Sequence, residues 1–254
     1  RMTLVWRPGN NAITDPDALI YIDKVEKTDG QNLEYDVAKA INDFVVNCKN
    51  DGIWDAIKAC CILTGARTTN GALVPLVGAA PDSYNFDLVG DTDYDRKTGL
   101  KGDGSTKYLD STRAGNSQSG SNLHLSTYTT TSIGNNSYTI GLTKIVAPTS
   151  SNGVFVLNNS SYIYANSPSG ASANASQLEI TGAGFYGASR SNGTTFSASH
   201  AGTSQTKTVS AGTLPAESFY VFADNLVGTG ARNYTNSRLA FYSIGESLDL
   251  AALD

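Results

Sequence analysis

The sequence predicts a mainly β protein: an antiparallel sandwich preceded by a short helical segment. Helical periodicity is confined to the first quarter of the 254 residues, and short apolar and aromatic runs separated by turn residues follow it. Hydrophobic residues make up 40% of the chain, which is enough for a core. We therefore divide the chain into an N-terminal helical lead-in, residues 1–66, and a β-sandwich, residues 67–254, that ends with the start of a further helix.

Three helices are predicted in the lead-in. Asp15 followed by Pro16 is typical of a capped helix start, and Gly30 ends this first helix. The second helix has the clearest periodicity; its apolar stripe is Leu33, Val37, Ala40, Ile41, Phe44, Val45 and Cys48. A third helix is expected over Ile53–Leu63, before Gly65. Exposing the stripe would cost several kcal/mol at about 25 cal/mol per Å², so we expect it to pack on the sandwich or on a neighbouring chain.

The rest of the chain is poor in charge and rich in strand-forming residues. Between Ser111 and Thr213 only five side chains are charged, and Ser, Thr, Asn and Gly separate the apolar runs. A hairpin is expected where Val154–Leu157 precedes Tyr162–Tyr164. Further strands are expected at Phe185–Tyr186, Ser218–Ala223 and Arg238–Ile244, and a helix at Ser247–Leu253. Because Ser218–Ala223 is apolar at successive positions, we expect it to be covered on both faces.

Composition excludes several classes of function. With 18 basic and 23 acidic residues the net charge is −5, which does not suit a phosphate backbone, so we expect no nucleic-acid partner. No apolar run is long enough to span a bilayer, and no secretory signal is visible, so we expect no membrane insertion. The odd count of cysteines, Cys48, Cys60 and Cys61, predicts reduced core residues and folding in a cytoplasm.

No catalytic constellation emerges, and we predict that the protein is not an enzyme. Gly182–Gly187 matches the dinucleotide pattern GxGxxG, but a turn-like sequence follows where a helix is required, which indicates a chance match. Neither His124 nor His200 has a carboxylate nearby in the sequence, and no GxSxG elbow exists. Glycoside hydrolysis needs two carboxylates facing one cleft, and no closely alternating acidic pair is visible on one predicted strand.

Two groups of residues are candidates for binding. Asp91, Asp93 and Asp95 alternate like the opening of a calcium loop, but the glycine and the bidentate glutamate of an EF-hand are missing. Two interpretations remain open. One is a calcium site of another kind, and the other is a solvated acidic turn whose charge is balanced by nearby Arg and Lys. No other cofactor is expected.

The second group consists of tyrosines and asparagines in the β region. Such residues provide contact area and hydrogen bonds at low entropic cost, and they are also ordinary sandwich residues. As glycan-binding candidates we select four that lie near turn residues: Tyr162, Tyr164, Asn192 and Tyr234. Uncharged loops of this kind suit sugar hydroxyls and the apolar faces of sugar rings.

Three segments carry a resemblance to a known family. The runs Asp51–Ala59, Tyr94–Asp110 and Arg238–Asp249 resemble tailed-phage virion proteins, and the similarity covers roughly Asp15–Asp254. These proteins pair a short helical lead-in with a concanavalin-like, laminin-G-like jelly roll. The resemblance implies a structural role in the virion, as a tail-fibre adhesin or as capsid decoration, after folding in the host cytoplasm. It transfers no catalytic residue to this chain.

Several expectations about partners follow from this resemblance. A virion role implies other virion subunits as partners and repeated copies, for which we favour a homotrimer. The adhesin interpretation adds host surface polysaccharide, bound weakly at each site and strengthened by several copies. The alternative function is a carbohydrate-active enzyme, a glycoside hydrolase or lyase, of concanavalin-like fold. A pair of acidic residues on the concave sheet would distinguish that enzyme from a virion structural protein.

Overall fold

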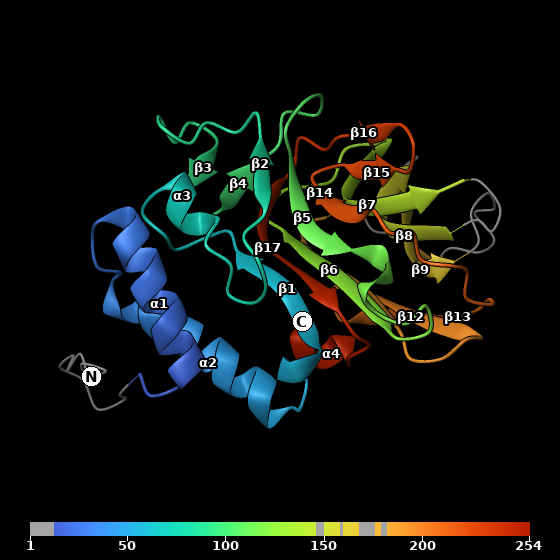
Figure 1. Cartoon of the computed structure of the whole chain (residues 1–254), viewed down its shortest axis with the longest axis horizontal. Helices are drawn as coiled ribbons and strands as arrows, with labels where there is room; N and C mark the ends of the chain where they lie inside the picture. Colours follow the sequence, from blue (N-terminus) through green and yellow to red (C-terminus); the bar gives the residue numbers. More distant parts are fainter. Residues whose placement is uncertain (1–12, 146–149, 158–159, 168–175, 179–181) are drawn as a thin grey trace.

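A computed structural model describes residues 13–145, 150–157, 160–167, 176–178 and 182–254. The chain forms two antiparallel sheets packed face to face, with a helical segment beside them (Figure 1). The predicted fold class, a mainly β antiparallel sandwich with a short N-terminal helical segment, is confirmed. No helix among these residues combines the length and the apolar character needed to cross a bilayer.

Two long helices open the described chain, α1 (Pro16–Asp29) and α2 (Tyr35–Asn50). The Asp15 side chain caps α1 by accepting from the backbone N–H groups of Asp17 and Ala18, and Gly30 ends the helix with a φ of 66°. The Asn42 side-chain oxygen accepts from the N–H of Asp15 at 3.0 Å, which ties α2 to the start of α1. Helix α1 therefore begins and ends where local sequence signals place it, whereas α2 begins after Leu33, the first residue of the predicted stripe.

The first sheet, sheet A, has eight strands, with β17 near its centre. Its strands are β13 (Thr203–Thr208), β12 (Thr195–His200), β11 (Gly184–Arg190), β6 (Leu123–Thr129), β17 (Arg238–Gly245), β4 (Gly99–Lys101), β3 (Tyr94–Asp95) and β1 (Ile57–Ile62). One edge of β17 pairs with β6, while β4 and β1 share its other edge. The late strand β17 therefore joins both halves of the sheet.

The second sheet, sheet B, has nine strands. They are β10 (Ser176–Leu178), β9 (Ser160–Ser167), β8 (Ser150–Leu157), β7 (Ser137–Lys144), β14 (Ser218–Val221), β5 (Tyr108–Ala114), β2 (Asp82–Tyr84), β15 (Asp224–Leu226) and β16 (Gly230–Arg232). The pairing of β15 with β7 is parallel, whereas the other described pairs are antiparallel. Strand β2 lies at one edge of this sheet.

The main core lies between the two sheets, where alternate residues of each strand turn inward. Leu125, Tyr186 and Ile244 enter it from sheet A, and Ile140 and Val221 enter it from sheet B. All five side chains have at most 1% of their surface exposed. Burial of this kind supplies the main stabilisation of the sandwich.

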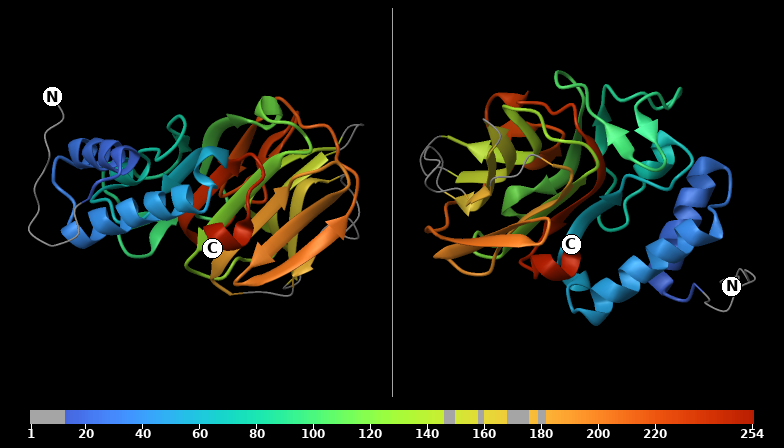
Figure 2. Two further views of the ribbon diagram at one scale, coloured as in Figure 1. Left: turned by 90° about the horizontal axis from the view of Figure 1, so that it is seen from below. Right: turned by 180° about the vertical axis from the view of Figure 1, so that it is seen from behind.

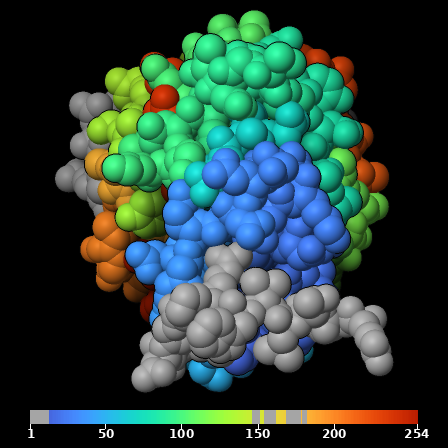
Figure 3. All heavy atoms as spheres, turned by 90° about the vertical axis from the view of Figure 1, so that its left-hand side faces the viewer, coloured from blue at the N-terminus to red at the C-terminus, as the bar shows by residue number. Residues whose placement is uncertain are grey.

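The helices pack on the outer face of sheet A, and no helix in the described part of the chain covers the outer face of sheet B. A second apolar cluster joins α1 to α2, and a third joins Cys48 at the end of α2 to Cys60, Phe185 and the C-terminal helix α4 (Leu250–Leu253). Among the described residues, neither cluster contains a residue of sheet B. Two further views show the helices beside the sandwich (Figure 2), and a view from that side shows them adjoining the next part of the chain (Figure 3).

The predicted third helix is wrong. A short 3₁₀ turn, η1 (Trp54–Ala56), leads directly into strand β1, which pairs with β17. Along β1, Ala59 and Cys61 enter the core of the sandwich, while Ile57 and Cys60 enter the cluster beneath α2 and α4. Because both faces of this strand are covered, its sequence lacks the polar alternation that indicates a strand. Residues 57–62 therefore belong to sheet A, although they precede the domain boundary predicted at residue 66.

Most other predicted elements are present. Strands β8 and β9 pair as an antiparallel hairpin, although the turn at residues 158–159 lies outside the described residues. The predicted C-terminal helix is α4, which begins after the capping side chain of Asp249. All three cysteines are buried and unpaired. The run Ser218–Ala223 does contain a strand, β14, but Tyr220 is only half-buried, so the expectation that both faces are covered is wrong.

Candidate functional site

The outer face of sheet B carries a group of tyrosines that the strand register brings together. Tyr84 on β2 lies directly opposite Tyr108 on β5. Asp110, two residues along β5, lies opposite Tyr220 on β14. The intervening residue Leu109 is fully buried in the core, so Tyr108 and Asp110 point to the outer face.

Four tyrosines form a continuous cluster on this face, which we call the tyrosine row: Tyr84, Tyr108, Tyr220 and Tyr234. The rings of Tyr84 and Tyr108 are stacked, with centroids 4.4 Å apart and planes within 2° of parallel. The Tyr220 ring lies 4.6 Å from Tyr108 on the other side, and the Tyr234 ring meets Tyr108 edge-on at 6.2 Å. Tyr84 stands at the sheet edge with 41% of its surface exposed.

The stacking direction determines what the tyrosine row presents to solvent. Rings stacked across neighbouring strands turn their faces toward each other, so the row presents ring edges and phenol groups outward. The outer ring face of Tyr84, the last in the row, has no strand beyond it in the described sheet. A planar apolar surface at one end therefore adjoins a line of hydroxyl groups.

The phenols of Tyr108 and Tyr220 stay protonated over the physiological range. Burial raises the pKa of Tyr108 to about 12, assisted by the neighbouring Tyr220, Tyr84, Tyr234 and Asp110. Burial, followed by the charge of Asp110, also raises the pKa of Tyr220. Both hydroxyls can therefore donate and accept a hydrogen bond, as sugar hydroxyls require of their partners. The Tyr234 hydroxyl donates to the carbonyl oxygen of Ala231 at 3.2 Å and remains an acceptor.

Tyrosines continue along the same outer face toward β9. The register places Tyr220 beside Gly141 of β7, Gly141 beside Gly153 of β8, and Gly153 beside Tyr164 of β9. The Tyr138 ring occupies the space above the two glycines, where a Cβ would lie within 3 Å of it. Three strand spacings, about 14 Å, separate Tyr164 from the tyrosine row.

Two carboxylates lie beside the tyrosine row. Asp82 of β2 is directly opposite Asp110 of β5, and Asp82 is exposed while Asp110 is half-buried. Within the residues that the structure describes, neither carboxylate forms an ion pair; Asp110 accepts from the backbone N–H of Thr112 at 2.8 Å. Like charges opposite each other on an antiparallel pair repel, so this arrangement is unfavourable for the sheet alone.

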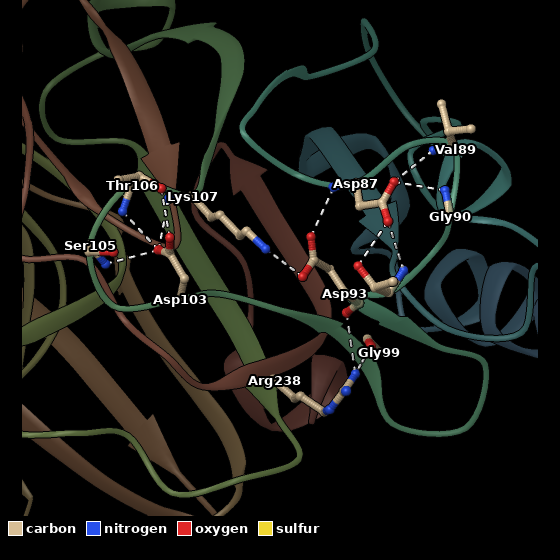
Figure 4. Close-up of polar contacts among 11 residues, drawn as sticks. Asp87, Val89, Gly90, Asp93, Gly99, Asp103, Ser105, Thr106, Lys107 and Arg238 are labelled. Carbon is tan, nitrogen blue, oxygen red and sulfur yellow. Dashed lines mark hydrogen bonds and ion pairs between the residues drawn. The ribbon is translucent and has the colours of Figure 1, made fainter.

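The nearby cations are already neutralised by other groups. Lys107, the residue before Tyr108, pairs with Asp93 (Figure 4). Arg232 donates from Nε to the buried carboxylate of Asp224 at 2.9 Å. The surface beside the tyrosine row therefore has an excess of negative charge.

The structure places the four predicted glycan-binding residues in different parts of the fold. Tyr234 belongs to the tyrosine row, and Tyr162 and Tyr164 lie on the same outer face three strands away. Asn192 does not join them. It lies in the turn between β11 and β12 of sheet A, and its side-chain oxygen accepts from the N–H groups of Thr194 and Thr195, so its amide closes that turn.

The structure does not bring the predicted calcium ligands together. Asp91 accepts from the N–H of Thr69, Asp93 pairs with Lys107, and Asp95 accepts from the N–H of Thr98. Figure 4 shows the Asp93 carboxylate turned toward Lys107 and the backbone of Asp87. Among the described residues, no group of three or more His, Cys, Asp or Glu is placed to hold a metal ion. The alternation instead reflects three separate turn and ion-pair contacts.

Sequence reasoning missed three of the four residues of the tyrosine row, Tyr84, Tyr108 and Tyr220. Tyr84 lies in a three-residue strand, and Tyr108 is the first residue of its strand, after a loop. The alternation Tyr108-Leu109-Asp110 was a local signal for a half-exposed strand. The adjacency of the four rings depends on the pairing of strands far apart in the chain, which no local pattern encodes.

The fold and the exposed tyrosine row together define a β-sandwich with an open aromatic and acidic face. No family model matches the chain, and no curated protein matches it. Among solved structures it is similar to the Trypanosoma rangeli sialidase in complex with 2,3-difluorosialic acid, with 13% identity and a TM-score of 0.41. The match covers 85% of this chain and 38% of the sialidase chain. A likeness at this level says nothing about the function of the protein.

Proposed function

We propose that this protein is a structural component of a bacteriophage particle that displays its β-sandwich at the surface and binds glycans through the tyrosine row. The observation that carries the binding proposal is the stacked row, flanked by Asp82 and Asp110, on the sheet face that no described helix covers. An exposed ring face stacks against the apolar face of a sugar, and phenols and carboxylates bind its hydroxyls.

The place in the virion rests on the resemblance of three sequence runs to tailed-phage virion proteins. Tail-fibre adhesin and capsid decoration are the two roles, and host surface polysaccharide is the proposed ligand. A single shallow site binds a sugar weakly, so we propose a homotrimer whose copies bind together and gain avidity. Light scattering on the purified chain and on virion extracts tests the trimer, and a monomer in both would contradict it.

A glycan array probed with the intact protein tests glycan binding. Tyr84→Ala removes the exposed ring at the sheet edge and should weaken binding about tenfold, in line with the worth of an aromatic contact. Tyr84→Phe keeps the ring and should retain most of the affinity. The matched control is Tyr128→Ala, because Tyr128 is equally exposed, at 42%, but lies on sheet A. Binding to no glycan, or equal loss in Tyr128→Ala and Tyr84→Ala, would refute the proposal.

A glycoside hydrolase is the second candidate, and one observation favours it. Asp82 and Asp110 lie opposite each other on adjacent strands, and carboxylates about 5 Å apart suit a retaining mechanism. Asp82 is exposed and Asp110 is half-buried, on a sheet face that no described helix covers, so we propose binding and not catalysis. Reducing ends released from the array-positive glycan, and their loss in Asp110→Asn, would support the hydrolase instead.

A further inference from the structure

The charge distribution around the tyrosine row selects among glycans. We propose that this face binds uncharged and amino-bearing glycans and excludes glycans that carry carboxylates, such as uronic acids and sialic acids. This inference rests on the proposed function, because it names the class of sugar that the same face accepts.

The first argument is the position of the two uncompensated carboxylates. Asp110 stands between Asp82 and Tyr220 in one row across three strands, and Tyr108 is two residues from it on the same face. A sugar stacked on Tyr84 and hydrogen-bonded along the row lies within one or two side-chain lengths of both carboxylates. A carboxylate on that sugar would meet two like charges, and the described cations nearest to this contact, Lys107 and Arg232, are paired with other carboxylates.

The second argument is that the nearby basic residues are engaged elsewhere. The ammonium of Lys107 binds Asp93, which also accepts from the backbone N–H of Asp87 at 2.9 Å (Figure 4). The guanidinium of Arg232 binds Asp224, and the Thr143 hydroxyl donates to the same carboxylate at 3.0 Å. Capturing an acidic sugar through either cation would break a contact made by a buried or largely buried carboxylate, which is unfavourable.

The third argument is that Asp82 and Asp110 repel each other in the absence of ligand. Carboxylates that accept hydrogen bonds from sugar hydroxyls, or that meet an ammonium group, lose part of this repulsion. An amino sugar stacked on Tyr84 also places its cation beside the outer, negative face of that ring and the hydroxyl groups of the row. Amino-bearing glycans should therefore bind best, neutral glycans next and acidic glycans least.

The test uses the intact protein and three oligosaccharides with one backbone. The probes are β-1,4-linked hexasaccharides of glucosamine, glucose and glucuronic acid, spotted with a broad microbial glycan array. Two carboxylates at contact distance should separate the amino and the acidic probe by at least tenfold in affinity at low salt. This preference should shrink in 0.5 M salt, where charges are screened over a few ångströms.

A charge-neutral double variant separates electrostatics from the rest of the site. Asp82→Asn with Asp110→Asn removes both charges and keeps one oxygen acceptor at each position, so the preference between amino and acidic glycans should disappear. Any affinity lost with the carboxylate hydrogen bonds should be lost for amino, neutral and acidic probes alike. Removing the repulsion should also leave thermal stability equal or higher. The matched control, Asp36→Asn, removes an exposed carboxylate from α2 and should change nothing.

The outcomes distinguish this inference from the proposed function. If neutral or amino glycans bind and acidic ones do not, and the double variant loses this preference, the proposed function and the selectivity are both supported. If acidic glycans bind as well as the others, or the double variant keeps the preference, the selectivity is wrong while glycan binding stands. If no glycan of any class binds, the proposed function fails and this inference fails with it.

Discussion

Protonation of His124 should lower the free energy of unfolding as the pH falls below about 6.5, which is above the range where carboxylates titrate. The imidazole is fully buried, its Nδ1–H donates to the carbonyl oxygen of Glu246, and Nε2 lies 2.9 Å from the Ser243 hydroxyl. Burial lowers the pKa of His124 to about 4, although the contact with Glu246 acts in the opposite direction. The folded protein therefore holds this residue neutral at pH values where the unfolded chain is protonated.

The direction and the size of the change in the free energy of unfolding follow from the difference between the folded and the unfolded pKa of His124. Because the unfolded imidazole titrates near 6.5, acidification below that pH favours the unfolded state, and the loss levels off only below the folded pKa. Between pH 7.5 and pH 5 the His124 contribution should lower the free energy of unfolding by about 2 kcal/mol. Burial also lowers the pKa of His200, which adds a loss in the same direction.

Urea unfolding at intervals from pH 5 to pH 7.5 measures this dependence. His124→Asn is the matched variant, because its amide can still donate to Glu246 but does not titrate. The variant should be less stable than the parent at pH 7.5 but lose about 2 kcal/mol less on acidification to pH 5. Equal losses in the two proteins over this range would refute the argument.

Three further predictions concern stability. Gly141→Ala should lower the free energy of unfolding by about 1–3 kcal/mol, because its Cβ would lie 2.7 Å from the Tyr138 ring. Gly193 faces open space, so Gly193→Ala should change the free energy of unfolding in urea little. Arg190→Met should cost about 3 kcal/mol in calorimetry, because the fully buried guanidinium donates to three backbone carbonyls outside its own strand; an unchanged melting temperature would contradict this. Asp29→Ala removes the acceptor for two backbone N–H groups, those of Arg67 and Thr68, just before the short helix α3 (Thr69–Ala72). Amide hydrogen exchange should become faster in residues 67–72 and stay unchanged in β6.

The sequence predicted elements whose signals are local. Asp15, Gly30 and the stripe of α2 act within one helix, and the structure places the caps of α1 at the first two. Strand β1 could not be assigned in this way, because α2 and α4 cover its outer side and both of its faces became apolar. A short apolar run has the same appearance in a buried strand and in a buried helix.

The candidate site was predictable only in part, for a related reason. Tyr162, Tyr164 and Tyr234 were selected because they lie near turns, and the tyrosine row contains only the last of them. The row exists because β2, β5 and β14 pair in one register, and that pairing is decided by the core residues between the tyrosines. Of the two interpretations of the alternating aspartates, the contacts favour the acidic turn over the calcium site, because each carboxylate binds a donor of the protein itself.

The central place of β17 also sets the order in which the chain can fold during synthesis. Strands β1, β4 and β6 are made early, but each needs residues 238–245 as its partner. Until those residues leave the ribosome, one edge of each of these strands lacks its native partner in the centre of sheet A. Such unpaired edges favour association between chains. Sheet A should therefore assemble late and cooperatively, and slow translation before residue 238 should prolong the aggregation-prone interval.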